Sequence, residues 1–442
     1  MKEIRSGVRN VWKKWNQTKK NLKNTMIRNS SYRYAIHREW AFADMKEVTF
    51  IRISLSQIKN KHWQRGERMP VSLTRKKSIQ HWDAYSIMHG NEEVASIRRD
   101  GTCSIYSSEM MPYNLYLEEE CEDDIDMRIQ NLDNFYYWCA SRVLTLDRQY
   151  AKEILNSIGA TQSSTDRERA QIALSYHCLS LMDIYWTREK TEETEFAEIN
   201  LFENHLEKAF VDVTLRGKQM TIQNSYLIAD DLGTQGCYPK AWIRKKDGFW
   251  LMKDGGLETV ERELLASRIC RCFRVNQVLY EEDFYDGQKV SVSKIITSLN
   301  ESIVPMEHFE LYALNHDMNK MEYILKLDGY SYYMMNILDY LIGNTDRHWG
   351  NWGMLIDNKT NKPIRLYDLM DFNKAFHAYD QMEGANCLTT ETKQSQKEAA
   401  IEAVQKIGLN QVGKISPDWF TDDAQREMFY RRLQLLTGYQ NI

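Results

Sequence analysis

The stretch LIGNTDRHWGNWG at residues 341–353, together with YDLMDFN at residues 367–373, decides how the rest of the chain can be organised. Asp346 and Asn351 stand five positions apart in the first stretch, and Asp371 follows an apolar run in the second. Two carboxylates and an amide, carried by a loop and by a strand end, predict a polar site.

The segment between these stretches predicts a β-hairpin. Residues 353–356 are apolar, residues 357–363 (DNKTNKP) form a polar turn, and residues 364–370 form a returning strand. Such a hairpin would bring Asp371 back toward the loop. The apolar periodicity of residues 330–342 predicts a helix that leads into the loop.

The spacing and the residue types indicate phosphoryl transfer. In such a site a loop Asp accepts the proton of the attacking hydroxyl, while an Asn five residues later and a further Asp hold Mg²⁺ against the phosphates of ATP. Asp346 is the predicted base, and Asn351 and Asp371 are the predicted metal ligands. His348 is a candidate for phosphate contact or for a structural hydrogen bond. Taken singly, each of these residues also fits a turn or a cap.

A second group of candidates lies upstream. Residues 229–253 predict a loop with Gly233 and Gly236, followed by two strands of which the second ends in Lys253. Glycines let the backbone approach a phosphate, and a lysine on a following strand pairs with it.

Lys253 requires an acidic partner. Glu263 is on the apolar side of the next predicted helix and is the expected partner, with Glu261 as the alternative. Both charges could instead be exposed, and such a pair contributes little to stability.

Together these motifs resemble the HipA-family serine/threonine kinases. G-N-x-D-x-H-x-x-N at residues 343–351, with the strand pair and D-F that follow, resembles their catalytic loop. G-x-x-P-K-A at residues 236–241 resembles their phosphate loop. The D-R-H-x-x-N wording also resembles the catalytic loop of phosphatidylinositol kinases. The resemblance spans roughly residues 112–442.

The resemblance implies an α+β, two-lobed protein-kinase-like fold, with a β-rich ATP-binding lobe, a helical C-lobe and an extra N-terminal region. It implies ATP and Mg²⁺ as cofactors and a serine or threonine hydroxyl of a protein as acceptor. Several family members are toxins paired with a DNA-binding antitoxin, so an antitoxin-like partner is implied as well. The family's loop also carries a serine that can be autophosphorylated, and Thr234 is the hydroxyl residue in the loop here. The implied nucleotide-binding residues are Gly233, Thr234, Gln235, Gly236, Lys240, Lys253 and Glu263.

Two other functions stay open. One is a kinase of the same fold that acts on a small molecule or lipid, and the other is a non-catalytic nucleotide-binding module. The presence of the whole set favours catalysis, because a degenerate kinase commonly lacks one member. That set is Lys253, Asp346, Asn351 and Asp371.

The 442 residues predict more than one compact part. We divide them into a basic helical arm, a small β-rich subdomain, an N-lobe with a helical insertion, and a helical C-lobe. The corresponding ranges are 1–44, 45–112, 113–300 and 301–442.

Several local elements are also predicted. They are a strand at 48–55, a hairpin at 94–105 that turns at 100–101, a helix at 147–158, a helix from an N-cap at Ser164 or Thr165 through 184, a helix at 257–273, strands at 275–280 and 289–295 joined at 286–287, and a C-terminal helix with Thr421 as N-cap.

Charge is unevenly distributed along the chain. Residues 1–80 carry 20 Lys and Arg against 5 Asp and Glu, a net +15, which leaves −19 for residues 81–442. Such a segment can meet nucleic acid or another acidic surface, and a solvated face or a contact with the acidic remainder explains it equally well.

The eight cysteines are scattered, with no C-x-x-C pair, which is typical of a reducing compartment. The sequence shows neither an apolar run of membrane-spanning length nor a signal-peptide pattern. We therefore expect a cytoplasmic protein without a membrane span.

Overall fold

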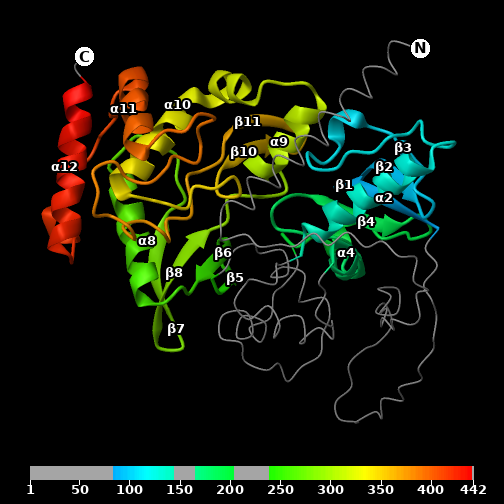
Figure 1. The fold of residues 1–442 in the computed structure, drawn as a ribbon. Coiled ribbons are helices and arrows are strands. Elements are labelled where there is room, and N and C mark those ends of the chain that lie inside the picture. Colours follow the sequence, from blue (N-terminus) through cyan, green and yellow to red (C-terminus); the bar gives the residue numbers. More distant parts are fainter. Residues whose placement is uncertain (1–82, 144–164, 204–237, 441–442) are drawn as a thin grey trace, which may run out of the picture. The chain divides into compact units, whose positions relative to one another are not determined.

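The computed structural model describes residues 83–143, 165–203 and 238–440. The chain divides into two units, Met1–Asp83 and Ala84–Ile442, and every element below belongs to the second (Figure 1). The basic segment, the strand at 48–55, the helix at 147–158 and the glycine loop lie outside the described residues.

The first sheet is antiparallel, and its strands follow the order β3-β2-β1-β4. Its strands are β1 (Ala84–His89), β2 (Glu92–Arg98), β3 (Cys103–Ile105) and β4 (Tyr185–Glu189). The predicted hairpin is confirmed, and Gly101 turns it with φ +87°. A Cβ at Gly101 would lie 2.2 Å from the carbonyl oxygen of Arg128, so only glycine fits there.

Two helices pack against this sheet through a shared apolar cluster. They are α2 (Ile125–Ala140) and α4 (Asp166–Ser175), and the short α5 (Phe196–Ile199) follows β4. Because β4 pairs with β1, the sheet joins segments from both sides of the boundary that we drew at residue 112.

Helix α4 begins where the sequence predicts. Thr165 is its N-cap and forms a reciprocal capping box with Glu168. The predicted extension through residue 184 is wrong, because the helix ends at Ser175. His177 and Cys178 have φ of 61° and 54°, a left-handed conformation that a right-handed helix cannot contain.

The second sheet is also antiparallel, and its strands follow the order β5-β6-β8-β7. Its strands are β5 (Lys240–Lys245), β6 (Gly248–Lys253), β7 (Tyr280–Tyr285) and β8 (Gln288–Lys294), and α8 (Leu257–Cys270) follows β6. The turn at Asp286–Gly287 is confirmed, with positive φ at both residues.

The strand expected at 275–280 is wrong in position, since β7 starts at Tyr280. The preceding residues instead make isolated bridges to distant segments, Phe273 to Gln411 and Gln277 to Leu369. These pairings are nonlocal, so the local strand pattern could not reveal them.

The third sheet, in the order β11-β10-β9, carries the predicted hairpin. Its strands are β9 (Glu301–Pro305), β10 (Gly353–Asp357) and β11 (Lys362–Leu366). The hairpin at 353–370 is therefore confirmed in outline. Strand β11 ends at Leu366, and an irregular segment continues to Asp371.

Helices predominate in the C-terminal part. They are α9 (Met306–Asn315), α10 (Lys320–Ile342), α11 (Gln396–Ile407) and α12 (Asp423–Tyr439), with a 3₁₀ turn at Pro417–Trp419 between the last two. Another 3₁₀ turn, Ser108–Met110, follows β3. The N-cap of α12 is Asp422, whose side chain accepts from the backbone of Gln425, so the prediction of Thr421 is wrong by one residue.

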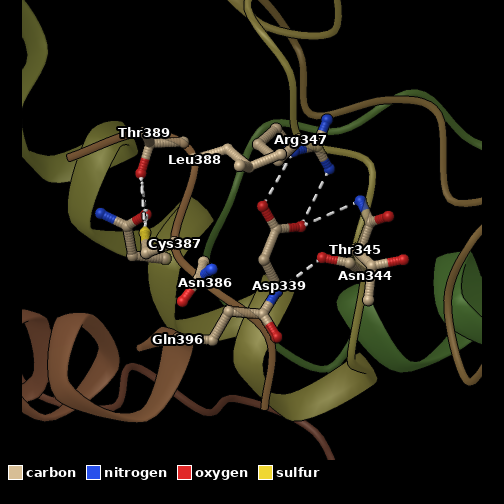
Figure 2. A pocket seen from close by; sticks show the side chains of 10 residues that line it. Asp339, Asn344, Thr345, Arg347, Asn386, Cys387, Leu388, Thr389 and Gln396 are labelled. Atoms are coloured by element: carbon tan, nitrogen blue, oxygen red, sulfur yellow. Dashed lines mark hydrogen bonds and ion pairs between the residues drawn. The ribbon is translucent and has the colours of Figure 1, made fainter. Parts of the chain in front are cut away.

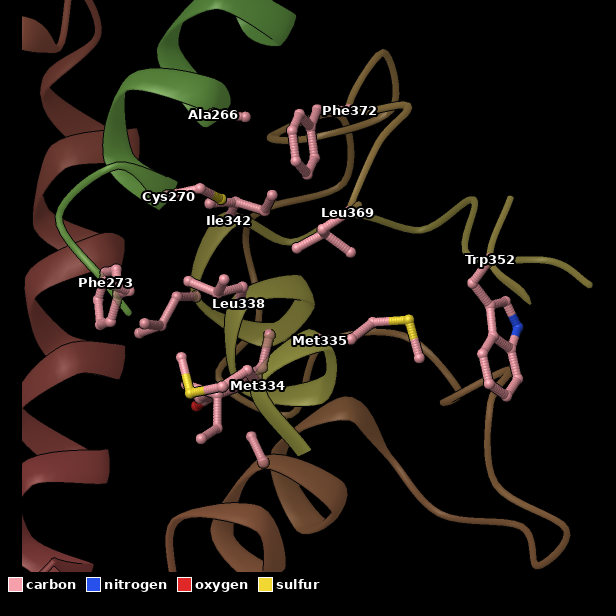
Figure 3. Close-up of a cluster of buried hydrophobic side chains, with 14 of the residues drawn as sticks. Ala266, Cys270, Phe273, Met334, Met335, Leu338, Ile342, Trp352, Leu369 and Phe372 are labelled. Carbon is pink, nitrogen blue, oxygen red and sulfur yellow. The ribbon is translucent and has the colours of Figure 1, made fainter. Parts of the chain in front are cut away.

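Helix α10 lies at the centre of the largest apolar cluster. Residues 334–342 of this helix are all buried, as expected of a helix that is surrounded by protein. Figure 3 shows Ile342 of this helix beside Cys270 of α8, and the side chains labelled there all belong to one buried cluster. The helix that delivers the loop is thus anchored in the core.

The fold is α+β, as predicted. One lobe is rich in β-structure and carries Lys253, and the other is mainly helical and carries Asp346. Among the described residues, no helix is both long and apolar enough to cross a membrane.

Candidate active site

Lys253, the last residue of β6, is the centre of a buried polar cluster. Its Nζ lies 2.8 Å from Glu263 Oε1, 3.2 Å from Tyr280 Oη and 3.2 Å from Asp371 Oδ1. An ammonium group has three protons to donate, and these three acceptors match them. Burial lowers the pKa of Lys253, but Asp371 and Glu263 outweigh burial and raise it well above its ordinary value. Lys253 therefore remains a cation.

Glu263 is the partner of Lys253, as predicted, and Glu261 is not. Glu263 is 2% exposed, and its second oxygen, Oε2, accepts from Ser291 Oγ at 2.5 Å. Glu261 is half exposed and lies 3.6 Å from Lys289. Glu263 lies on the buried face of α8 and Glu261 on an exposed one, and this difference in burial determines which of them pairs with Lys253.

Asp371 is held at both ends of its peptide backbone. Its N–H donates to Tyr280 Oη at 3.1 Å, and its carbonyl oxygen accepts from Asn344 Nδ2 at 3.3 Å. Burial raises the pKa of Asp371, but the charges of Lys253 and Lys240 outweigh burial and lower it to about 2. Asp371 is therefore an ionised carboxylate at neutral pH.

Lys240 lies directly opposite Lys253 in the β5–β6 register. Residues in direct cross-strand register point to the same face of a sheet. Two cations consequently face the Asp371 carboxylate from one side of the second sheet.

Asp346 is half-buried in the loop after α10. Its backbone N–H donates to Asn344 Oδ1 at 3.2 Å. Burial raises the pKa of its carboxyl; His348 and Lys374 oppose this effect, and the negative charge of Asp371 adds to it. The pKa remains above its ordinary value, and a higher pKa makes a carboxylate a better proton acceptor.

Asn351 is fixed within the same loop. Its Nδ2 donates to the backbone oxygen of Asp346 at 2.8 Å, and its backbone N–H donates to the backbone oxygen of His348 at 2.9 Å. The donor end of the side-chain amide is thus used inside the loop, and Oδ1 is the atom that a metal would use.

His348 makes a structural hydrogen bond within the loop, one of the two possibilities that the sequence left open. Its Nδ1 lies 3.0 Å from the backbone N of Gly350 and accepts that N–H. An accepting Nδ1 carries no proton, so in the neutral ring the proton is on Nε2.

Arg347 is a site residue that the sequence analysis missed. It is 2% exposed and pairs with Asp339 of α10, with Nε 2.9 Å from Oδ2 and Nη2 3.0 Å from Oδ1. Its Nη1 also donates to the backbone oxygens of Asn351 and Met370, at 2.8 and 2.5 Å. Arg347 therefore ties the loop to α10 and to the segment that ends at Asp371.

Figure 2 shows this ion pair among the side chains that line a small cavity. The cavity measures about 10 Å³, close to the volume that one water molecule requires. It is too small for a nucleotide and is therefore not the nucleotide site. A charged residue in an apolar run, Asp339 in ILDYLI, was the signal that could have revealed the pair.

The residues present fit Mg²⁺. In the described part of the chain, no group of three or more His, Cys, Asp or Glu side chains could hold a metal. Mg²⁺ usually takes one or two carboxylates and completes its shell with water and substrate phosphates, so it does not need such a group. Asp371 and Asn351 supply hard oxygen donors of the required kind. The predicted loop residues Gly233, Thr234, Gln235 and Gly236 lie outside the described ranges.

The sequence matches no protein-family model and no curated protein. In structure, the chain is similar to HipA of Shewanella oneidensis MR-1 in a complex of the HipA–HipB toxin–antitoxin system with its operator DNA. That match has 10% identity and a TM-score of 0.48, over 81% of this chain and 96% of the other.

The chain is also similar to the proinflammatory kinase CtkA of Helicobacter pylori. This match has 13% identity and a TM-score of 0.35, over 45% of this chain and 90% of the other.

Proposed function

We propose that this chain is an ATP- and Mg²⁺-dependent kinase that phosphorylates a serine or threonine hydroxyl of a protein. The observation that carries the proposal is the convergence of Lys253, Glu263 and Asp371, which lie on different elements and meet within hydrogen-bonding distance. A cation, its orienting carboxylate and an ionised metal ligand are the parts that phosphoryl transfer requires.

Lys253 and Lys240 would bind the phosphates of ATP. Both lysines belong to the two strands that follow the glycine loop, and they share one face of the sheet. Glu263 keeps Lys253 in register, and Ser291 keeps Glu263 in turn. When ATP binds, Lys253 would exchange its contact with Asp371 for a contact with the phosphates. Asp371 would then be available to bind the metal.

Asp371 and Asn351 would hold Mg²⁺. The bound ion would neutralise the charge that develops on the transferred phosphoryl group and the leaving ADP. The protein contributes the direction of both side chains, which Tyr280, Asn344 and Arg347 fix by hydrogen bonds.

Asp346 would accept the proton of the acceptor hydroxyl. The hydroxyl oxygen would then form its bond to the γ-phosphorus while the bond between that phosphorus and ADP breaks. The raised pKa of Asp346, caused by burial, suits this task. His348 would stiffen the loop around Asp346, and a phosphate contact through its Nε2 is compatible with the Gly350 hydrogen bond.

Three further parts of the proposal concern the protein's partners and its location in the cell. From the family resemblance we include an antitoxin-like protein partner, and from the charge of residues 1–80 we include contact with nucleic acid. We also include a reducing, cytoplasmic location, which agrees with free thiols at all seven cysteines in the described ranges. A small-molecule or lipid acceptor remains the second candidate, because D-R-H-x-x-N resembles phosphatidylinositol kinases.

The test is incubation of the purified chain with Mg²⁺ and γ-labelled ATP, alone, with lysate proteins and with lipid and small-molecule pools. Asp371→Ala and Asp346→Ala should abolish transfer with the fold intact. Asp247→Ala, at an exposed turn of the second sheet, is the matched control and should transfer normally.

Label on protein serine or threonine supports the proposal. Label only in the lipid or small-molecule pool replaces it by the second candidate. ATP that binds without turnover in every pool, or transfer at the full rate by Asp346→Ala, overturns the catalytic assignment.

A further inference from the structure

The hydroxyl of Tyr280 joins the two halves of the candidate site. Its Oη accepts from Lys253 Nζ at 3.2 Å and from the backbone N–H of Asp371 at 3.1 Å. A phenol oxygen has two lone pairs, and both are used here. Tyr280 is the first residue of β7, so a single atom of the β-rich lobe contacts the phosphate-binding lysine and the metal-binding carboxylate residue together.

Tyr280 is itself rigidly held. The residue is 5% exposed, and its backbone N–H donates to Ser267 Oγ of α8 at 3.2 Å. Its ring meets that of Phe372 edge to face, with centroids 5.9 Å apart. A neutral phenol hydroxyl can hold Lys253 without replacing the carboxylate of Asp371.

Asp371 requires such a restraint. Its φ is +59°, a left-handed conformation that residues with a side chain rarely adopt. Tyr280 accepts a hydrogen bond from the backbone N–H of Asp371, and Asn344 donates one to the backbone carbonyl oxygen of Asp371. This backbone conformation fixes the direction of the Cα–Cβ bond, and the contact with Lys253 then holds the carboxylate.

We propose that Tyr280 is a positioning residue that keeps Asp371 oriented for the metal and keeps Lys253 beside it. The inference rests on the proposed function and adds a residue that the sequence motifs do not contain. Tyr280 does not touch the reacting atoms, and it acts through Asp371 and Lys253.

The test is Tyr280→Phe, which removes the hydroxyl and retains the ring that packs on Phe372. The matched control is Tyr113→Phe. Tyr113 is also buried, at 8% exposed, and its hydroxyl donates to the backbone oxygen of Asn361 at 2.8 Å, outside the cluster around Lys253.

The measurement is calorimetric binding of ADP and of ATP to the full chain, once with Mg²⁺ and once with EDTA. For each nucleotide, the dissociation constant in EDTA divided by that in Mg²⁺ reports how strongly the metal supports nucleotide binding. We expect Tyr280→Phe to reduce this ratio about 10-fold, the usual lower effect of losing a residue that orients a metal ligand. Tyr113→Phe should leave the ratio unchanged.

The outcomes separate the two proposals. A wild-type chain that binds neither nucleotide overturns the proposed function and the assignment of Tyr280 with it. Wild-type binding that Mg²⁺ strengthens, with an equal ratio in Tyr280→Phe, overturns the assignment of Tyr280 alone. Thermal unfolding of both variants checks the fold, and a general packing defect would lower the unfolding temperature without changing the metal ratio.

Discussion

Arg347 and Asp339 form a buried ion pair in which two guanidinium nitrogens each contact one carboxylate oxygen, at 2.9 and 3.0 Å. Both residues are less than 5% exposed. The remaining nitrogen of Arg347 holds the backbone of Asn351 and Met370. One buried cation thus connects α10, the loop of Asp346 and the segment of Asp371.

Asp339→Asn should strongly destabilise the protein. The variant removes the carboxylate to which the buried Arg347 cation is hydrogen-bonded, and breaking a buried pair in this way costs about 3–5 kcal/mol. Urea denaturation measures the free energy of unfolding. The control is Glu383→Gln, which breaks the half-exposed Lys397 pair and should cost less than about 1 kcal/mol. Equal losses in the two variants would contradict the prediction.

Asp346→Asn should abolish transfer and raise the stability of the protein at pH 7. Burial raises the pKa of Asp346 above 3.8. Ionisation of Asp346 is therefore less favourable in the folded chain than in the unfolded chain. The ionised carboxylate consequently destabilises the fold above about pH 3.8. Thermal unfolding should show a higher midpoint for the variant at pH 7, and the gain should vanish below about pH 3.8. A lower midpoint at pH 7 would be the contrary result.

Asp371 should have the opposite pH dependence. Its pKa in the folded chain is about 2, below the ordinary 3.8, because Lys253 and Lys240 outweigh the effect of burial. The carboxylate thus contributes stability that is fully present above pH 3.8 and is lost as the pH falls toward 2. The contribution is about 2 kcal/mol.

The measurement is urea unfolding at intervals from pH 5 to about pH 2 for the wild type and for Asp371→Asn. The difference in unfolding free energy between the two should shrink as the pH falls, because the protonated wild-type residue no longer attracts Lys253. A difference that stays constant over this range would show that the Asp371 charge does not stabilise the fold.

Gly353→Ala should disrupt the strand pair that follows the loop. A Cβ at Gly353 would lie 2.1 Å from the backbone oxygen of Val304 and 2.8 Å from Pro305 Cα on the neighbouring strand. Backbone atoms cannot move aside easily, and we expect a loss of about 1–3 kcal/mol in denaturant unfolding. Gly438→Ala in α12 has open space around its Cβ and should gain up to about 1 kcal/mol. A neutral Gly353→Ala would contradict the close approach.

Local elements followed from the sequence where their causes are local. The Thr165–Glu168 capping box lies within four residues, and the turns at Gly101 and at Asp286–Gly287 depend on their own backbone angles. The strand expected at 275–280 was wrong because distant residues bind that segment, and the helix expected through 184 was wrong because two left-handed residues end it.

The sequence by itself determined the hairpin that returns Asp371 toward the loop, because this hairpin depends on short-range periodicity and on a local turn. The α+β fold and the pairing of Lys253 with Glu263 were expected from motifs that resemble those of HipA-family kinases. Only the tertiary structure decided that Glu263 faces the sheet, that Tyr280 joins Lys253 to Asp371, and that Arg347 pairs with Asp339. Lys253 and Asp371 are 118 residues apart, and a contact over that separation exists only once the packed core has brought its elements together.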